Sequence, residues 1–163
     1  MASGTRQSEI VFSLVDRLTD LDPEAEKEIP VSSWEQEREF KRLLCRDLSA
    51  LLNTRRAERD FDPAFEECTN SLLSFGINDF TSYNLKNAIE QEHVRRSIER
   101  AIRQFEPRLV RVEVTVDAPD ETRPVLQFQI AAFLRVETEG EPIVFDITLQ
   151  RESRRMIVSG GNA

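Results

Sequence analysis

The chain has 163 residues, with 22 basic and 30 acidic side chains and a formal net charge of −8 at pH 7. This length predicts one domain that can bury a hydrophobic core without help from disulfides or metals. Because nucleic acids are polyanions that bind positive surfaces, the acidic balance argues against a nucleic-acid partner.

The N-terminal region is set apart from the rest of the chain. It begins with a short amphipathic stripe of apolar residues: Val11, Leu14, Val15, Leu18 and Leu21. Residues 22–30 then form an acidic linker that contains two prolines. We assign residues 1–30 to an N-terminal arm, which either packs on its own domain as a helix or detaches to bind a partner. Residues 31–158 are predicted to form a single domain, and residues 159–163 a flexible tail.

A long helix is predicted over residues 34–53. Ser33 and Gln36 have the spacing of a capping box, which is typical of a helix start. The apolar residues that follow recur at the spacing that places them on one helix face: Phe40, Leu43, Leu44, Leu48, Leu51 and Leu52. Residues 54–63 are too charged for a core and end in a proline, so we expect a surface connection there. Its arginines are more typical of a solvated face than of a binding site for an acidic partner.

A second helix is predicted from near Ser82 to Phe105. The preceding segment, residues 71–80, has turn residues and no clean period, and we expect an ordered loop held in place by Phe75 and Phe80. Within the helix the polar run at residues 91–93 is a candidate break. Pro107 ends the helix, because proline has no backbone donor and disfavours the helical conformation of the residue before it.

Beyond this proline the apolar period changes to two, which is typical of half-buried strands. In the first strand the valines at positions 110, 112, 114 and 116 alternate with polar residues. Further strands are expected at residues 126–132 and 144–149, with a short fourth at residues 154–158. Helices followed by an antiparallel meander of three to four strands define an α+β fold.

The pentapeptide at residues 105–109 joins helix and sheet. Glu106 lies at the C-terminal end of the helix, where the partial negative charge of the helix dipole disfavours an anion by roughly 0.3–1 kcal/mol. A cation could offset this cost, either Arg108, Arg111 or one on a partner. From spacing alone, both a local ion pair on the surface and a functional contact remain open.

Little in the sequence points to a cofactor or a metal. The single histidine, His93, lies in a charged helical segment and is best interpreted as solvated, and the glycines are too scattered for a phosphate-binding loop. Cys45 and Cys68 follow no metal-ligand or disulfide spacing, which favours reduced thiols in a cytosolic protein. No apolar run is long enough to span a bilayer, and we expect no cofactor and no membrane insertion.

Catalysis has one candidate group. Glycoside hydrolysis needs two suitably spaced carboxylates with different proton affinities, and an acidic chain supplies many such pairs, so the pattern is unspecific. Glu106 is the one carboxylate with an unusual predicted setting. Sugar grooves normally also offer aromatic platforms, yet the chain has one Trp and one Tyr. We therefore expect no catalytic residue and keep a peptidoglycan-cleaving enzyme that uses Glu106 as the alternative. A small regulatory module that binds through the N-terminal arm is a third hypothesis.

The order of several motifs resembles the TssE family, whose members are baseplate subunits of type VI secretion systems. The segments that carry the resemblance are residues 38–42, 46–48, 51–56, 71–80, 105–109 and 141–146. The same segments are similar to the baseplate wedge protein of contractile phages, which was once labelled a baseplate lysozyme. The likeness extends over residues 35–158.

The resemblance implies a structural role in the cytoplasm, without hydrolysis of peptidoglycan. Glu106, Pro107 and Arg108 would form the attachment point to the other baseplate wedge subunits. The sheet is similar to the part of a sheath subunit that exchanges strands, which implies that it starts the first ring of contractile sheath subunits by accepting a strand. The residues expected at the accepting edge are Val144, Asp146, Thr148, Met156 and Val158.

Overall fold

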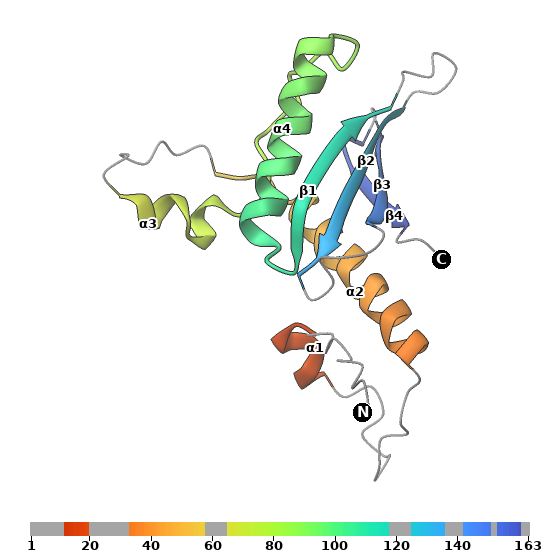
Figure 1. The fold of residues 1–163 in the computed structure, drawn as a ribbon. Helices are drawn as coiled ribbons and strands as arrows, with labels where there is room; N and C mark the ends of the chain where they lie inside the picture. The colour runs from red at the N-terminus through yellow and green to blue at the C-terminus, as the bar shows by residue number, and fades with distance from the viewer. Residues whose placement is uncertain are drawn as a thin grey trace, which may run out of the picture.

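The computed structural model describes residues 12–19, 33–57, 65–117, 125–135, 142–150 and 153–160. The helices are α1 (Leu14–Leu18), α2 (Ser33–Asn53), α3 (Glu66–Thr69), the 3₁₀ helix η1 (Leu72–Ser74) and α4 (Ala88–Phe105). The strands are β1 (Leu109–Val116), β2 (Val125–Leu134), β3 (Ile143–Gln150) and β4 (Met156–Gly160). Helices precede a four-stranded sheet, so the predicted α+β fold is confirmed (Figure 1).

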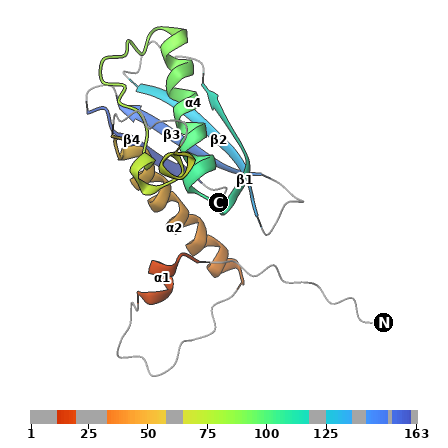
Figure 2. The same cartoon turned by 90° about the vertical axis from the view of Figure 1, so that its left-hand side faces the viewer.

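The sheet is an antiparallel meander with the strand order β1-β2-β3-β4. Along β2, buried residues alternate with more exposed ones, so one face of the sheet points into the core. α4 lies along β1, α2 lies along β4, and the two helices contact each other (Figures 1 and 2). Together they cover the buried face, and the hydrophobic core lies between them and the sheet.

The two long helices follow the predicted apolar period. All six apolar residues of the α2 stripe are buried. α4 starts later than predicted, because the Asn87 side chain caps it by accepting a hydrogen bond from the N–H of Ile89 at 2.9 Å. The helix then continues without a break through residues 91–93. Its buried residues are Val94, Ile98, Ala101 and Ile102.

β1 contains a β-bulge, so its inward-facing residues differ from the strict alternation that the sequence predicts. The pairing with β2 shifts after Val110, and Arg111 has a φ of +52°. The extra residue changes which side chains face inward, so Leu109, Val112 and Val114 are buried while Val110 is only half-buried. A strict period of two cannot indicate such an insertion.

The loop at residues 71–80 is ordered, as the sequence predicts. The Phe75 ring meets the Phe105 ring of α4 edge-on, with the centroids 5.2 Å apart. Phe80 is buried, and the Arg55 guanidinium lies 4.3 Å from the centroid of its ring. Both aromatic side chains therefore hold the loop against the helices.

The described part of the N-terminal arm, residues 12–19, packs on its own domain. The Phe12 ring meets the Phe40 ring of α2 edge-on, with a centroid distance of 5.9 Å. Three apolar side chains of α1 remain exposed: Leu14, Val15 and Leu18. The rest of the arm lies outside the described residues. At the other end, β4 extends to Gly160, into the expected tail, and residues 161–163 again lie outside.

Candidate functional site

The turn from α4 to β1 carries the Glu-Pro-Arg motif. Glu106 ends the helix, because its N–H still donates to the Ile102 carbonyl at 2.9 Å while its backbone has left the helical region, at φ −117° and ψ 79°. Its carbonyl accepts from the Leu109 N–H at 3.1 Å. Pro107 is exposed at the turn. The helix therefore ends where proline predicts.

Glu106 is buried and paired within the chain. The residue is 5 % exposed. Its Oε1 accepts from Arg108 Nε at 2.6 Å and from the Arg108 backbone N–H at 3.2 Å, while Oε2 accepts from Arg108 Nη2. Of the cations considered from the sequence, Arg108 makes the bidentate contact, whereas the Arg111 guanidinium lies 5.6 Å from the centroid of the Phe133 ring.

Arg108 connects the turn to α2. Its Nη2 donates to Asp47 Oδ2 at 2.7 Å, and its guanidinium lies 5.6 Å from the centroid of the Phe40 ring. The hydrogen bond to Glu106, together with the one to Asp47, outweighs burial and raises the pKa of Arg108 above its ordinary value. Its Nη1 is buried without a hydrogen-bond partner among the described residues. The guanidinium therefore stays charged in a largely dry setting.

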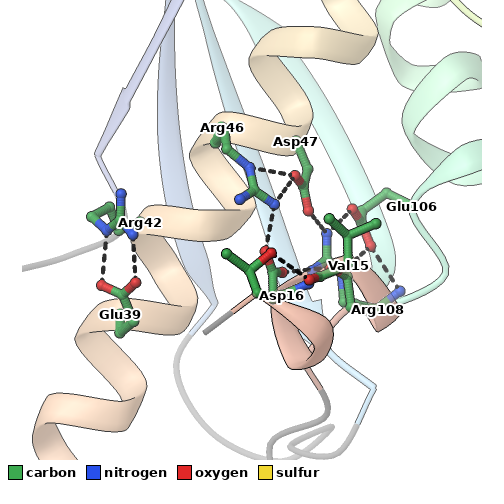
Figure 3. A network of polar contacts seen from close by, with 10 residues as sticks. Val15, Asp16, Glu39, Arg42, Arg46, Asp47, Glu106 and Arg108 are labelled. Carbon is green, nitrogen blue, oxygen red and sulfur yellow. Dashed lines mark hydrogen bonds and ion pairs between the residues drawn. The ribbon is translucent and has the colours of Figure 1, made fainter. Parts of the chain in front are cut away.

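The contacts continue from α2 to α1. Arg46 Nη2 donates to Asp47 Oδ1 and to Asp16 Oδ1, each at 2.7 Å. Burial opposes ionisation of Asp16, but hydrogen bonds from Ser13 and Arg46 outweigh it and lower the pKa of Asp16. Figure 3 shows Asp16 of α1 beside Arg46 and Arg108. We call this set of five charged residues the turn network: Asp16, Arg46, Asp47, Glu106 and Arg108.

Sequence reasoning identified the two residues of the turn itself and missed the other three. Asp47 lies 61 residues before Arg108, so no local pattern joins them. The available signal was indirect, because residues 46–48 are among the segments that carry the resemblance. Only the fold shows that α2 delivers a second carboxylate to the turn.

The residues expected at an accepting edge fall on two strands. Val144, Asp146 and Thr148 lie on β3, which pairs with β2 on one side and β4 on the other. Their backbone is therefore inside the sheet, and this part of the expectation is corrected. Met156 and Val158 lie on β4, which is an outer strand.

The edge of β4 is partly occupied by α2. The Asn53 side chain donates to the Met156 carbonyl at 2.8 Å and accepts from the Met156 N–H at 2.9 Å, as a neighbouring strand would. Near the other end of β4, Cys45 Sγ lies 3.4 Å from the Gly160 carbonyl oxygen. A strand that joined β4 would have to displace side chains of a core helix.

The arrangement offers Glu106 no access to a substrate, since the carboxylate is buried and Arg108 holds both of its oxygens. His93 is exposed on α4, and its ring meets Tyr83 edge-on at 6.4 Å. Within the described ranges, no group of His, Cys, Asp or Glu residues could hold a metal ion. Cys45 and Cys68 are free thiols. The described helices include none that is long and apolar enough to cross a membrane.

The fold is an α+β domain whose turn between α4 and β1 is held by the buried Glu106 and Arg108 pair. The chain belongs to the family of the baseplate wedge protein gp25, which its sequence matches over residues 38–139. The match includes most of α2 and all of α4, the turn, β1 and β2, so the resemblance to a baseplate wedge family is confirmed. The family is a structural component of baseplates, which supports a structural baseplate role for the chain.

Two solved structures are similar to the chain in fold. One is the baseplate complex from the type VI secretion system, with 17% identity and a TM-score of 0.49, covering 70% of this chain and 95% of that chain. The other is a protein from Geobacter sulfurreducens described as a tail lysozyme, with 19% identity and a TM-score of 0.44, covering 73% of this chain and 94% of that chain. No curated protein matches the sequence significantly.

Proposed function

We propose that the chain is a baseplate subunit of a type VI secretion system, assembled on the cytoplasmic side of the inner membrane. It joins the wedge subunits through the turn at residues 106–108 and initiates the contractile sheath by accepting a strand. Membership of the wedge family supports the baseplate role. The observation that supports the wedge contact is the turn network, because it ties the exposed turn at the end of α4 to α2 and, through α2, to α1.

The turn network supplies geometry rather than reactivity. A buried ion pair gains little stability over apolar residues of the same shape, so a fixed arrangement is its main contribution. Glu106 is too buried to touch a partner, whereas Pro107 is exposed. Arg135 also holds the turn, donating from Nε to the Pro107 carbonyl at 2.8 Å and from its backbone N–H to the Arg108 carbonyl at 2.9 Å. Glu106 and Arg108 thus position Pro107 for contact.

The exposed apolar side of α1 extends this contact surface. Leu14, Val15 and Leu18 are each more than half exposed on the helix that the turn network holds through Asp16. Large apolar side chains that stay exposed beside fixed polar groups are typical of protein interfaces. The wedge partner should therefore present an apolar surface to α1 and to Pro107.

Strand addition requires an outer strand whose backbone groups can pair with another chain. The described sheet has two such strands, β1 and β4. This arrangement supports the second part of the proposal.

Co-expression of the chain with tagged wedge subunits of its secretion system tests the first part. Capture here means the amount of wedge subunit that co-purifies with the chain. Arg108→Met and Glu106→Gln should each reduce capture by about tenfold or more, because either change frees the turn from its ion pair. The matched control is Arg42→Met, which breaks the exposed Arg42 to Glu39 pair on α2 (Figure 3) and should leave capture unchanged. Thermal unfolding of each purified variant shows whether it is folded.

A charge reversal and a surface variant separate fold from contact. The double variant Glu106→Arg, Arg108→Glu exchanges the two charges within the turn. It tests whether a pair of opposite charges in either order is enough to bind the wedge subunits. Leu18→Asp changes an exposed side chain, so it should keep the fold and lose capture. The proposed contact is excluded if the folded Arg108→Met and Leu18→Asp variants both capture wedge subunits as well as the wild type does.

A further inference from the structure

The backbone of β1 has an outer side that faces away from β2. Alternate residues of a strand direct their N–H and C=O groups to opposite sides. Asp117, just beyond β1, donates its N–H to the Gln127 carbonyl of β2 at 3.0 Å. Asp117 therefore directs its backbone groups toward β2. By the alternation, the valines at positions 112, 114 and 116 direct theirs to the opposite side, away from β2.

Two arginines of α4 occupy this outer side. Arg103 donates to the Val112 carbonyl from Nη2 at 2.7 Å and from Nε at 3.2 Å. Arg95 donates from Nη1 to the Val114 carbonyl at 3.0 Å. An incoming strand would place its own N–H donors at these two carbonyls. The guanidinium groups therefore stand where a strand would pair.

Carboxylates on the same helix hold both arginines. Glu99 is bonded to Arg95 Nη1 and, at 2.7 Å, to Arg103 Nη2. Glu92 accepts from Arg95 Nε at 2.7 Å and from its Nη2 at 2.9 Å. We call these four residues the α4 ladder: Glu92, Arg95, Glu99 and Arg103. Because these partners lie on α4 itself, the arginines can keep them on leaving β1, and the contacts that a strand must replace are those with the two carbonyls.

The α4 ladder borders an open groove. The groove between α4 and β1 has a volume of about 790 Å³ and is lined by the α4 ladder and by residues 111–116. The Arg103 side chain is 58 % exposed, and that of Arg95 is 21 % exposed. A strand that enters along β1 would move arginine side chains into solvent, whereas a strand that joined β4 would have to displace the partly buried Asn53.

We infer that Arg95 and Arg103 form a removable cap on β1, and that β1 rather than β4 is the edge at which a strand of a partner protein adds. The occupant is an extended protein segment, because the groove presents carbonyl acceptors on alternate residues of a strand. This inference rests on the proposed strand addition and specifies its edge. In the unassembled subunit the cap prevents two copies from pairing through β1.

Sedimentation velocity on the purified chain tests the cap alone. The double variant Arg95→Met, Arg103→Met keeps the apolar stems and loses the donors, so it should form dimers or larger species. The loss of two positive charges makes an acidic chain more negative, which would oppose association without a specific contact. The matched control, Arg38→Met with Arg42→Met, removes the same charge from exposed positions of α2 outside the α4 ladder and should sediment as a monomer, like the wild type.

A proline identifies the edge. Val116 directs its N–H outward, and proline is tolerated on an outer strand at such a position while blocking further pairing. Val116→Pro added to the uncapped double variant should restore the monomer. The inference is overturned if the folded double variant stays monomeric, or if it associates equally with and without the proline.

Co-expression with the sheath subunits of the same secretion system tests the occupant. Val116→Pro alone should lower sheath capture by about tenfold or more and leave wedge capture intact. Sheath capture at the wild-type level by this variant would contradict the assignment of β1. If the wild type itself captures no sheath subunit, the proposed strand addition fails, and the sedimentation result still decides whether the cap exists.

Discussion

Arg108 of the turn network and Arg103 of the α4 ladder make comparable contacts but differ in burial. In the turn network the Arg108 side chain is 18 % exposed and lies between Glu106 and Asp47. In the α4 ladder the Arg103 side chain is 58 % exposed above an open groove. An unpaired buried charge is strongly destabilising, whereas an exposed ion pair contributes little. Arg108 therefore fixes the geometry of the turn, whereas Arg103 can leave β1.

The difference matches two kinds of contact that a baseplate subunit would need. A lasting contact with wedge subunits, as proposed for the turn, would suit residues whose buried charges are costly to separate. The proposed addition of a sheath strand would take place only during assembly, which suits an edge that stays closed until a strand arrives. Arginine can serve both in a fixed contact and in a releasable one, because exposure to solvent lowers the free energy needed to break its ion pairs.

The largest effect is expected in the turn network. Arg108→Met leaves the Glu106 carboxylate buried without its cation and should lower the free energy of unfolding by about 3–5 kcal/mol. Urea denaturation measures this. The control Arg42→Met, which breaks an exposed pair on α2, should cost no more than about 1 kcal/mol. Equal losses in the two variants would show that the turn network is not a buried unit.

The next largest loss of stability is expected when the contact between α2 and the edge of β4 is removed. Asn53→Ala removes both side-chain hydrogen bonds to the Met156 backbone and should lower the free energy of unfolding by about 2 kcal/mol. Thr54→Ala, at an exposed position whose hydroxyl bonds within the helix turn, is the control and should cost less. If Asn53→Ala is as mild as the control, β4 is not closed by α2, and the contrast with β1 weakens.

A smaller effect is expected in the α4 ladder. The Arg95→Met, Arg103→Met double variant should lower the free energy of unfolding by less than Arg108→Met does, because the Arg103 side chain is 58 % exposed, although that of Arg95 is 21 % exposed. The loss should shrink further in 1 M salt, where the Debye length is about 3 Å. A loss as large as that of Arg108→Met, or one that salt does not change, would mean that the ladder is a fixed part of the fold.

The smallest effect concerns pH. Hydrogen bonds from Arg95 and Arg96 lower the pKa of Glu92 from 4.5 to about 2. A carboxylate whose pKa is lower in the folded state contributes stability above its unfolded pKa and loses it as the pH falls through the folded value. The difference in urea midpoint between the wild type and Glu92→Gln should therefore shrink between about pH 5 and pH 2. A difference independent of pH would show that the Glu92 contacts are too solvated to matter.

The fold was predictable where local chemistry decides it. Pro107 marked the end of α4, and the apolar period of α2 indicated its buried face correctly. The start of α4 was missed because the Asn87 cap, rather than the apolar pattern, sets it. The bulge at Arg111 was missed because an inserted residue leaves the valine pattern looking regular in sequence.

The candidate site was predictable only in part, because its contacts join distant segments. Glu106 and Arg108 are two residues apart and were identified together. The contacts of Arg108 with Asp47 and of Asn53 with Met156 span 61 and 103 residues. No sequence period carries such information, since helix packing against the sheet brings these side chains together. For the same reason, the sequence could not indicate which strand edge is open.

Hydrogen exchange measured by mass spectrometry, on the free chain and on the chain within its assembled baseplate and sheath, tests the central claim most directly. We predict that assembly protects the amides of residues 106–116, which cover the turn and β1, and leaves those of residues 156–160 in β4 unchanged. Protection of β4 with no change at the turn and β1 would contradict both the wedge contact and the assignment of β1 as the accepting edge.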